Sequence, residues 1–385
     1  MSVAVAVDRL CAVRPQWVGI VSAGEAIGLG ADELLHAGPP LRDPTRPPPV
    51  LLSSAVTTLL HDGRAADAAA AEALVRDGSV RLSPAQARGC VLPLAFVASA
   101  TTPMCSVVDA ARPHASRCAP LTTPRGFDTR MGTRDPALRS RLEQRDRQFA
   151  PRLGRLLDAH GPVPLWPLAV AGLAAGDDLH SRTTGANTAL ADWCRVAGSG
   201  DMANDIEATP LFFLTLWMAA CSLMLAAADG ADGDSLVVRA GGNGESFGVA
   251  IAASPQQWVA TEATPPRGRR LQGGDDIEVC GAVGDSAVVD MLGLGAQRLA
   301  LAPEPRQAFS GFVPEAWEGR AETLLVAPHP LIAPPWPVGL DARRVAASGQ
   351  APLVALAMLA SDGRTGFVGR GVYQPPVELF ARASA

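Results

Sequence analysis

LFFLTLWMAACSLMLAAA, residues 211–228, is an unbroken run of apolar and small side chains. Its length meets the minimum for a helix that crosses a bilayer. The run contains Thr215, Cys221 and Ser222, has no flanking arginines that would set a membrane topology, and lies mid-chain between motif-rich segments. A helix that is apolar all round belongs in a protein core. We therefore predict one fully buried helix here and no insertion into a membrane.

The segments on either side of this run predict three domains. Residues 1–130 mix helical windows with short β-prone runs and indicate an α/β domain, whereas residues 131–232 consist of long helical windows. Residues 233–385 return to short apolar runs separated by Gly and Pro, which indicates a second α/β domain. The expected helices lie at 3–13, 50–61, 65–76, 135–159, 164–179, after Arg182 and at 211–228, and the expected strands at 79–82, 104–109, 235–240, 246–252, 323–328 and 353–360. The predicted fold class is α/β, with two mixed regions flanking a central helical subdomain.

All 33 basic residues of the 385-residue chain are arginine. The absence of lysine excludes a Schiff-base mechanism, attachment of pyridoxal phosphate and a Walker-type phosphate loop. The net charge is −5, the basic residues are scattered and aromatic residues make up 5% of the chain, so nucleic acid and anionic membrane are not expected partners. Arginine must carry any anion binding.

The cysteines are odd in number and none belongs to a CxxC motif. This pattern argues against a disulfide framework and a zinc site, and it predicts that most of the cysteines are small buried fillers in a reducing compartment. Residues 1–10 lack a basic segment followed by an apolar stretch, so no secretory signal is predicted. We expect a cytoplasmic protein without a metal. The cysteines are Cys11, Cys90, Cys105, Cys118, Cys194, Cys221 and Cys280.

GDDLHSRTTGAN, residues 176–187, is denser in polar groups than its surroundings and follows the apolar segment 165–175. If the cluster were helical, Asp178 and Arg182 would lie on one face, and Asp177 would lie three residues from His180. Arg182 and Asn187 would then be substrate-binding candidates, and a carboxylate, with Asp178 as the candidate, would orient His180 as a catalytic residue. The alternative is a helix cap with a surface ion pair, and the spacing leaves both open.

A second candidate catalytic histidine, His36, lies in LLHAGPP, residues 34–40. The apolar residues before it and the Gly-Pro turn after it predict a strand end, where loops carry function. The neighbouring glycine permits close approach of the backbone to a ligand. The alternative is a capped strand in which a local hydrogen bond holds the histidine.

Three further motifs place substrate-binding candidates in turns or at helix starts. AGGNGESFG (240–248) predicts a hairpin turn at Asn243 and Gly244, which are also candidates to face a ligand oxygen. GDSAVVDMLGLG (284–295) predicts a loop entering a helix, with Asp285 or Ser286 as N-cap and backbone amides suited to phosphate. GLDARR (339–344) predicts a helix start at which Arg343 could bind an anion. A purely structural turn or cap is the alternative for each.

Taken in order, LLHAGPP, GDDLHSRTTGANTAL, NGESFGV, GDSAVVDMLGLGA and GLDARRV resemble the oxamate carbamoyltransferase subunit family. The resemblance includes the spacing between the motifs and the Pro-Arg-Gly block at 266–268, and it covers nearly the whole chain. It implies transfer of a carbamoyl group between oxalurate and phosphate, giving oxamate and carbamoyl phosphate in purine catabolism. It also implies a complex with other subunits and no organic cofactor.

The candidate residues suit this chemistry, because carbamoyl transfer passes through an oxyanion and involves phosphate and carboxylate groups. We expect Arg182 to clamp an anion, His180 or His36 to polarise the carbonyl, and Asn243 with the 284–286 amides to hold the oxyanion or phosphate. Residues 84–90, PAQARGC, stand where a histidine- and glycine-rich segment is expected. A related ureido acid is therefore an alternative substrate.

Two other functions remain open from the sequence. The chain could be a noncatalytic assembly subunit of such a complex, or it could hydrolyse a ureido or amide substrate with water in place of phosphate. The expected partners are a small anionic substrate, other subunits of the complex and further copies of the chain.

Overall fold

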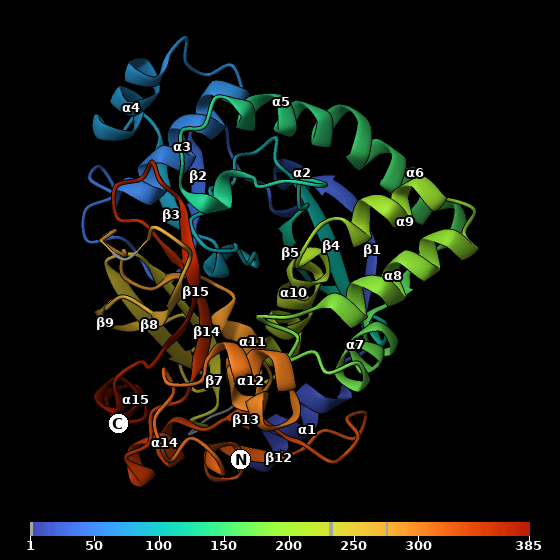
Figure 1. The fold of residues 1–385 in the computed structure, drawn as a ribbon, viewed down its shortest axis with the longest axis vertical. Helices are drawn as coiled ribbons and strands as arrows, with labels where there is room; N and C mark the ends of the chain where they lie inside the picture. The colour runs from blue at the N-terminus through green and yellow to red at the C-terminus, as the bar shows by residue number, and fades with distance from the viewer. Residues whose placement is uncertain (1–2, 231–233, 275) are drawn as a thin grey trace.

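The computed structural model describes residues 3–230, 234–274 and 276–385, and both its N-terminal and its C-terminal parts mix helices with strands (Figure 1). Within those residues the strands form five sheets, and every strand pairing is antiparallel except that of β2 with β3. The predicted α/β fold class is confirmed.

A four-stranded sheet has the order β5-β4-β1-β6. Three of its strands come from the N-terminal part of the chain, and β6 comes from the central part. Ser22 and Glu25 form a reciprocal capping box that starts the helix after β1. The helices predicted at 50–61 and 65–76 and the strand end at His36 are confirmed. The elements are α1 (Val3–Ala12), β1 (Pro15–Ser22), α2 (Ala23–Ile27), β2 (Glu33–His36), α3 (Pro49–His61), α4 (Ala68–Arg76), β3 (Arg81–Pro84), η1 (Gln86–Arg88), β4 (Pro103–Asp109), β5 (Arg112–Pro120) and η2 (Thr129–Met131).

The central part is predominantly helical, as predicted. Its first expected helix, 135–159, is one continuous helical segment with a π-helical turn, η3, between α5 and α6. The elements are α5 (Ala137–Gln144), η3 (Arg145–Phe149), α6 (Ala150–His160), β6 (Val163–Pro164), α7 (Leu165–Ala174), α8 (Thr184–Val196), α9 (Gly200–Glu207) and α10 (Phe212–Ala226).

The C-terminal part contains the remaining sheets. Asn243 and Gly244 make the predicted hairpin turn between β7 and β8. The strand expected at 323–328 is shorter than predicted, because its first two residues end a helix. The elements are β7 (Val237–Asn243), β8 (Ser246–Ile251), β9 (Val259–Glu262), β10 (Arg267–Arg270), β11 (Val283–Gly284), α11 (Ala287–Leu292), η4 (Gly295–Leu301), α12 (Pro303–Ala308), α13 (Arg320–Leu324), β12 (Leu325–Pro328), β13 (Pro337–Leu340), α14 (Ala342–Ser348), β14 (Val354–Leu359), β15 (Phe367–Tyr373) and α15 (Val377–Ala383).

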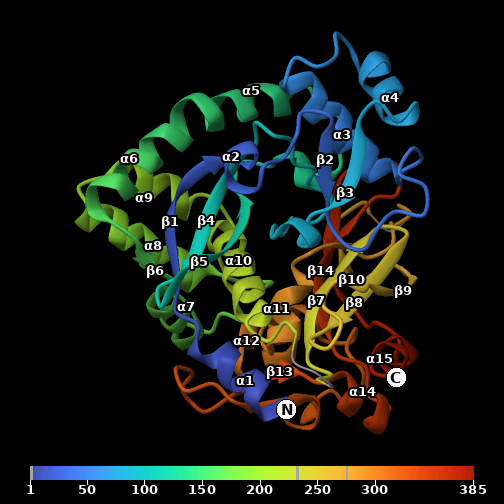
Figure 2. The same ribbon diagram turned by 180° about the vertical axis from the view of Figure 1, so that it is seen from behind.

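Helix α10 lies at the centre of the molecule, between the β1-β4-β5 strands and the C-terminal sheets (Figures 1 and 2). It contacts β4, β5 and β1 on one side, β7 and α11 on another, and α1, α7 and α8 elsewhere. Every residue from Phe212 to Leu225 is buried, so the predicted core helix is confirmed. In the described ranges no single helix is long and apolar enough to cross a membrane, although α9 and α10, bent by 83° at their junction, pass together by length and composition.

The largest hydrophobic cluster joins residues from all three predicted regions, among them Trp17, Trp217 and Phe247. The predicted boundary at 232 and 233 lies outside the described residues. The division into three domains therefore stays a prediction.

One expectation about the cysteines needs correction. Cys90 and Cys118 form a disulfide between the segment after η1 and strand β5, whereas the sequence spacing argued against such pairing. The two residues are 28 positions apart in the chain, and the spacing of cysteines in a sequence does not show which of them the fold brings together. The other five cysteines are free, and all but Cys11 are buried.

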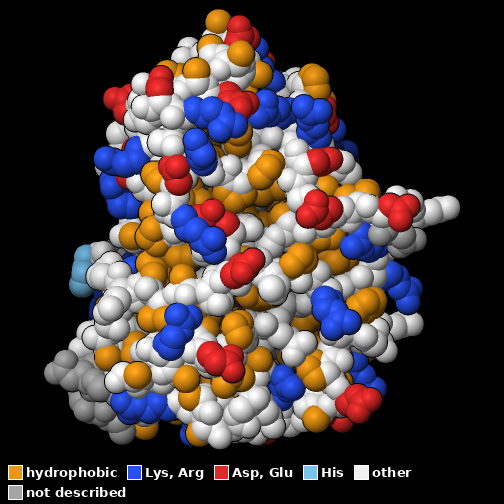
Figure 3. Space-filling view, turned by 90° about the vertical axis from the view of Figure 1, so that its left-hand side faces the viewer, with side chains coloured by type: hydrophobic (Ala, Val, Ile, Leu, Met, Phe, Trp, Pro, Cys, Tyr) orange, Lys and Arg blue, Asp and Glu red, His pale blue; other side chains and the backbone are white. Residues whose placement is uncertain are grey.

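The face drawn in Figure 3 carries arginine and carboxylate side chains interspersed, with hydrophobic side chains between them at mid-height.

The central position of α10 predicts a large stability effect for a change in its core face. Leu216 is 1% exposed, so Leu216→Ala leaves a cavity and is expected to lower the free energy of unfolding by about 2–5 kcal/mol. Val196→Ala on α8 is the control, because Val196 is 90% exposed and its truncation costs little. Urea denaturation followed by circular dichroism measures both, and equal effects of the two variants would contradict the central role of α10.

Candidate functional site

A pocket of about 880 Å³ has four walls from the central and C-terminal parts of the chain, and residues 93–94, 127–131 and 286 border it as well. The loop after α7 and the start of α8 form one wall, and residues 207–215 at the start of α10 form the next. The paired strands β14 and β15 form a third wall, and α12 together with Phe309, which follows it, forms the fourth. The pocket therefore brings together the polar motif 176–187 and the buried helix that the sequence singled out.

The segment 176–183 is a loop, not the helix that the i,i+4 interpretation assumed. Leu179 has a positive φ of 65°, and this left-handed turn stops the chain from continuing helically. Asp178 holds the loop together: its carboxylate accepts hydrogen bonds from the backbone N–H groups of His180 and Arg182 and from the hydroxyl of Ser181. Asp178 is fully buried, so its role in this geometry is to fix the loop.

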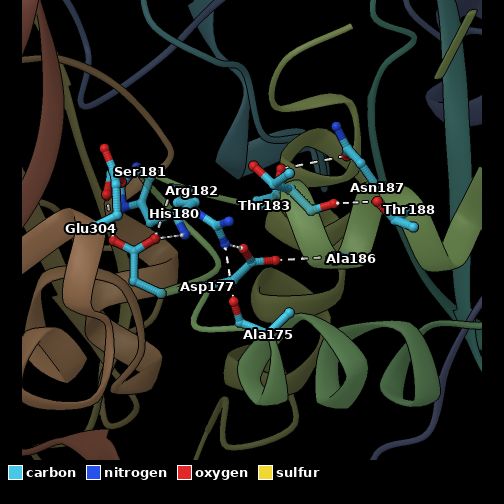
Figure 4. Close-up of polar contacts among 12 residues, drawn as sticks. Ala175, Asp177, His180, Ser181, Arg182, Thr183, Ala186, Asn187, Thr188 and Glu304 are labelled. Carbon is cyan, nitrogen blue, oxygen red and sulfur yellow. Dashed lines mark hydrogen bonds and ion pairs between the residues drawn. The ribbon is translucent and has the colours of Figure 1, made fainter. Parts of the chain in front are cut away.

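The ion pairs of the loop differ from those that the spacing suggested. Arg182 pairs with Asp177 and not with Asp178, and it also donates to the carbonyl of Ala175 at 3.4 Å. The second oxygen of Asp177 accepts from the backbone N–H of Ala186 at 3.0 Å, which anchors the first turn of α8 (Figure 4). Arg182 is 26% exposed at its side chain and borders the pocket, whereas Asp177 lies fully buried behind it.

His180 is oriented by Asp290 of α11, not by a carboxylate of its own loop. The two side chains meet at 2.7 Å between Nδ1 and an oxygen of Asp290, and the other oxygen of Asp290 accepts from the backbone N–H of Ala296 at 2.8 Å. Gly295 makes this approach possible, because a Cβ at its left-handed position would collide with Asp290 and with His180. Nδ1 is thus committed to Asp290, and the ring borders the pocket with Nε2 in no hydrogen bond to any described residue.

The surroundings of His180 favour its charged form. Burial alone lowers the pKa of His180, but the charge of Asp290 and its hydrogen bond outweigh burial, and the pKa is raised above its ordinary value. The charged form of this histidine carries a second N–H, at Nε2, that can donate to a ligand.

Three arginines border the pocket, and two of them were not among the predicted site residues. Arg370 of β15 makes two contacts with the carboxylate of Glu304, at 2.5 and 3.2 Å, and donates to the carbonyl of Ser181 at 3.3 Å. Arg130 is 8% exposed, and its guanidinium lies 3.7 Å from Asp128 without a hydrogen bond to it. Arg130 is therefore the pocket arginine with the most donor capacity left for an anion.

Backbone strain is concentrated around this pocket. Among the described residues, four non-glycine residues have positive φ, and two of them, Leu94 and Leu211, line the pocket. A third, Leu179, precedes His180. Left-handed leucines are unfavourable and persist where the surrounding structure holds them, which is typical of functional sites.

Asn187 and Ser286 also border the pocket. Both ends of the Asn187 amide are used by the fold, since the oxygen accepts from the backbone N–H of Phe213 and the nitrogen donates to the carbonyl of Thr209. This side chain joins α8 to the start of α10. Ser286 precedes α11 and its hydroxyl does not cap the helix.

His36 and Asp285 lie away from the pocket lining, inside the protein. Burial lowers the pKa of His36 to about 4, and its Nδ1 contacts the carbonyl of Ala37 at 2.8 Å. Asp285 accepts from the backbone N–H groups of Gly38 and Leu92 and from the amide of Gln86. Asp285 therefore joins the 284–295 motif to the N-terminal part, and its own N–H bonds to Leu92 instead of facing a phosphate.

The remaining predicted residues do not border the pocket. Asn243 is buried in the hairpin turn, donates to the carbonyl of Pro39 and accepts from the N–H groups of Glu245 and Ser246. Gly244 takes the positive φ of 89° that this turn requires. Arg343 is exposed at the start of α14, which is the solvated helix start given above as its alternative. Residues 84–90 do not line the pocket either.

Asp290 is the residue whose role the sequence interpretation missed, although its motif was quoted. A single carboxylate inside the apolar segment AVVDML is a usable signal, because a charge on a buried helix needs a partner. The sequence does not say which partner. Within the described ranges, no three His, Cys, Asp or Glu side chains gather as metal ligands.

Fold and pocket together define a class of protein: an α/β protein with a pocket bordered by arginines and by a histidine that a buried aspartate orients. The family model described as "Oxamate carbamoyltransferase subunit AllG" matches residues 80–286. The chain belongs to this family.

Individual relatives are similar over almost the whole chain. An uncharacterized protein, YahG of Escherichia coli K12, is 27% identical and the match covers 98% of this chain and 84% of YahG. The oxamate carbamoyltransferase subunit AllG of the same organism is 25% identical, with 99% of this chain and 95% of AllG covered. A crystal structure of a conserved protein of unknown function from Enterococcus faecalis V583 has the same fold, with a TM-score of 0.90, 21% identity and coverage of 98% of this chain and 94% of that chain.

The contacts of Asp285 predict a structural effect when it is changed. Asp285→Ala leaves two buried backbone N–H groups, those of Gly38 and Leu92, without acceptors, and the expected loss is about 1–3 kcal/mol of unfolding free energy for each. The exposed Arg343→Ala is the control and is expected to change stability by less than about 0.5 kcal/mol. Urea denaturation measures both. A normal stability of Asp285→Ala together with weakened phosphate binding would instead support the ligand-binding role predicted from the sequence.

Proposed function

We propose that this chain is a catalytic subunit of a carbamoyltransferase complex, and that its pocket passes a carbamoyl group between phosphate and the nitrogen of oxamate or a related acid. Membership of the AllG family supports the reaction class. The single observation that carries the catalytic assignment is the His180–Asp290 pair, which leaves Nε2 of His180 available in a pocket that three arginines border.

In the direction that makes carbamoyl phosphate, a phosphate oxygen bonds to the ureido carbon and the bond from that carbon to nitrogen breaks. The phosphate loses its proton, and the leaving nitrogen takes up one proton, so the reaction is balanced. His180 is placed to deliver that proton from Nε2, because Asp290 holds the ring through Nδ1 and raises its pKa. The carbonyl oxygen becomes an oxyanion in the transition state, and the same imidazolium or a nearby arginine stabilises it.

The arginines divide the work of anion binding. Arg182 and Arg370 are each paired with a carboxylate, which orients their guanidinium groups and lowers the positive charge that they present. Arg130 keeps unused donors and is the candidate to bind the substrate carboxylate or phosphate. Asp178 supports the site indirectly by fixing the loop that carries His180 and Arg182.

A pH profile tests the role of His180. Burial lowers the pKa of His180, but Asp290 outweighs burial and the pKa is raised above its ordinary value, so activity that needs this proton is lost as pH rises through the raised pKa. Asp290→Asn is expected to shift this loss to lower pH, and His180→Gln to lower kcat by about 10²–10⁴-fold. His114→Gln, at an exposed histidine of β5, is the matched control. The assay is carbamoyl phosphate formation from oxalurate by the assembled complex, and unchanged turnover in His180→Gln and Arg182→Ala would contradict the proposal.

Arg130 predicts a different kinetic signature. Arg130→Gln removes a charge that contacts the anion in ground state and transition state alike, so KM is expected to rise about 10–100-fold with a small change in kcat. Arg112→Gln, at an exposed arginine of β5, is the control. A fall in kcat without a rise in KM would place Arg130 outside the ground-state binding of the anion.

The two alternative functions have their own outcomes. If ammonia is released at the same rate with and without phosphate, the chain is a hydrolase. If the isolated chain binds no carbamoyl compound by calorimetry but co-purifies with other subunits of a complex, it is an assembly subunit.

A further inference from the structure

We propose that the acid whose nitrogen exchanges the carbamoyl group in this pocket is larger than oxamate and carries an aliphatic or aromatic substituent. This inference rests on the function proposed above and names the substrate class of the same site.

The size of the pocket is the first argument. Its volume of about 880 Å³ is near the upper end of the range of about 300–1,000 Å³ that is typical of pockets for drug-sized ligands. Oxamate and oxalurate are far smaller, and they would fill only the part of the pocket near His180. The rest of the volume has to be taken by water or by another part of the ligand.

The residues that line the pocket indicate whether water or a further part of the ligand occupies the rest of its volume. Apolar side chains border it from four separate parts of the chain: the segment at 93–94, the loop at 127–131, the start of α10 and the strand pair β14–β15. Phe127 is 52% exposed and Leu94 and Leu211 are partly exposed, whereas Met131 and Leu214 are 8% exposed. Binding is favoured when an apolar ligand group displaces water from such apolar side chains. An entirely polar acid would leave these side chains in contact with water.

The electrostatics point the same way. Arg182 and Arg370 are already neutralised by Asp177 and Glu304, so the pocket is not a uniformly basic site built for small polyanions alone. A ligand with one carboxylate, one ureido group and one apolar side chain matches this lining. N-carbamoyl α-amino acids with large side chains have that composition.

The chemistry for such an acid is the same transfer. Starting from carbamoyl phosphate, the nitrogen of the acid bonds to the carbamoyl carbon and the bond from that carbon to the phosphate oxygen breaks. The nitrogen loses a proton to the unprotonated fraction of His180 at Nε2, and phosphate leaves and receives that proton. No oxidant, reductant or further reactant is needed.

The preference is expected in binding as well as in turnover. Calorimetry with the full chain would compare N-carbamoyl-L-leucine and N-carbamoyl-L-phenylalanine with N-carbamoylglycine and oxalurate. The two large compounds are expected to bind at least about tenfold more tightly than N-carbamoylglycine. The reason is that each methylene group buried in an apolar pocket raises affinity by about tenfold or more.

Two variants probe the wall itself. Ala357 lies on β14 and borders the pocket, so Ala357→Leu fills part of the volume and is expected to bring the leucine-to-glycine affinity ratio close to one. Leu214→Ala removes wall contacts and is expected to weaken only the large compounds, by about tenfold. Leu271→Ala is the control, since Leu271 is 53% exposed and does not line the pocket.

The outcomes separate this inference from the proposed function. If oxalurate binds as tightly as the large compounds, or if Ala357→Leu weakens all four ligands equally, the substrate class is overturned, while carbamoyl phosphate formation from oxalurate would leave the function standing. If the large compounds bind preferentially but no transfer depends on phosphate, the function fails and the pocket's preference stands. Failure of all four compounds to bind contradicts the inference.

Discussion

The burial of helix α10 is the constraint on which the rest of the structure depends. A helix that is apolar on every face has to be covered on every face, and here the N-terminal sheet, the C-terminal strand β7 and the surrounding helices do so. These elements come from distant parts of the chain, and each of them packs against α10. Leu211, Leu214 and Thr215, at the start of the helix, line the pocket, which places the candidate site at the junction that the helix creates.

Charges at this junction are handled by pairing. Asp290, Asp177 and Asp178 are fully buried, and a buried carboxylate is costly unless it is paired or accepts hydrogen bonds. Asp290 holds His180, Asp177 holds Arg182, and Asp178 accepts three hydrogen bonds from its own loop. The pairs orient the functional groups and keep them in fixed positions, so that a largely apolar pocket can still present a histidine and arginines to a ligand.

The sequence predicted helices and turns more reliably than it predicted which side chains contact one another. The helices predicted from long apolar segments, at 50–61 and 211–228, and the hairpin at Asn243 were correct because each depends on residues close in the chain. The i,i+4 interpretation of Asp178 and Arg182 was wrong because the left-handed Leu179 turns the segment into a loop, and no rule of spacing anticipates a leucine in that conformation. The partner of His180 lies 110 residues away, and the disulfide joins residues from separate elements.

By itself, the sequence determined the α/β class, the buried helix, the polar motif at 176–187 and the family, because these follow from local composition, periodicity and the order of motifs. Only the tertiary structure decided which of those polar residues act together. It brings His180 to Asp290 and places Arg130 and Arg370 beside the pocket. Asn243, Asp285 and Arg343 lie outside the pocket lining. The physical reason is that a pocket is formed by packing between elements far apart in the chain, and distance in the chain does not measure distance across a core.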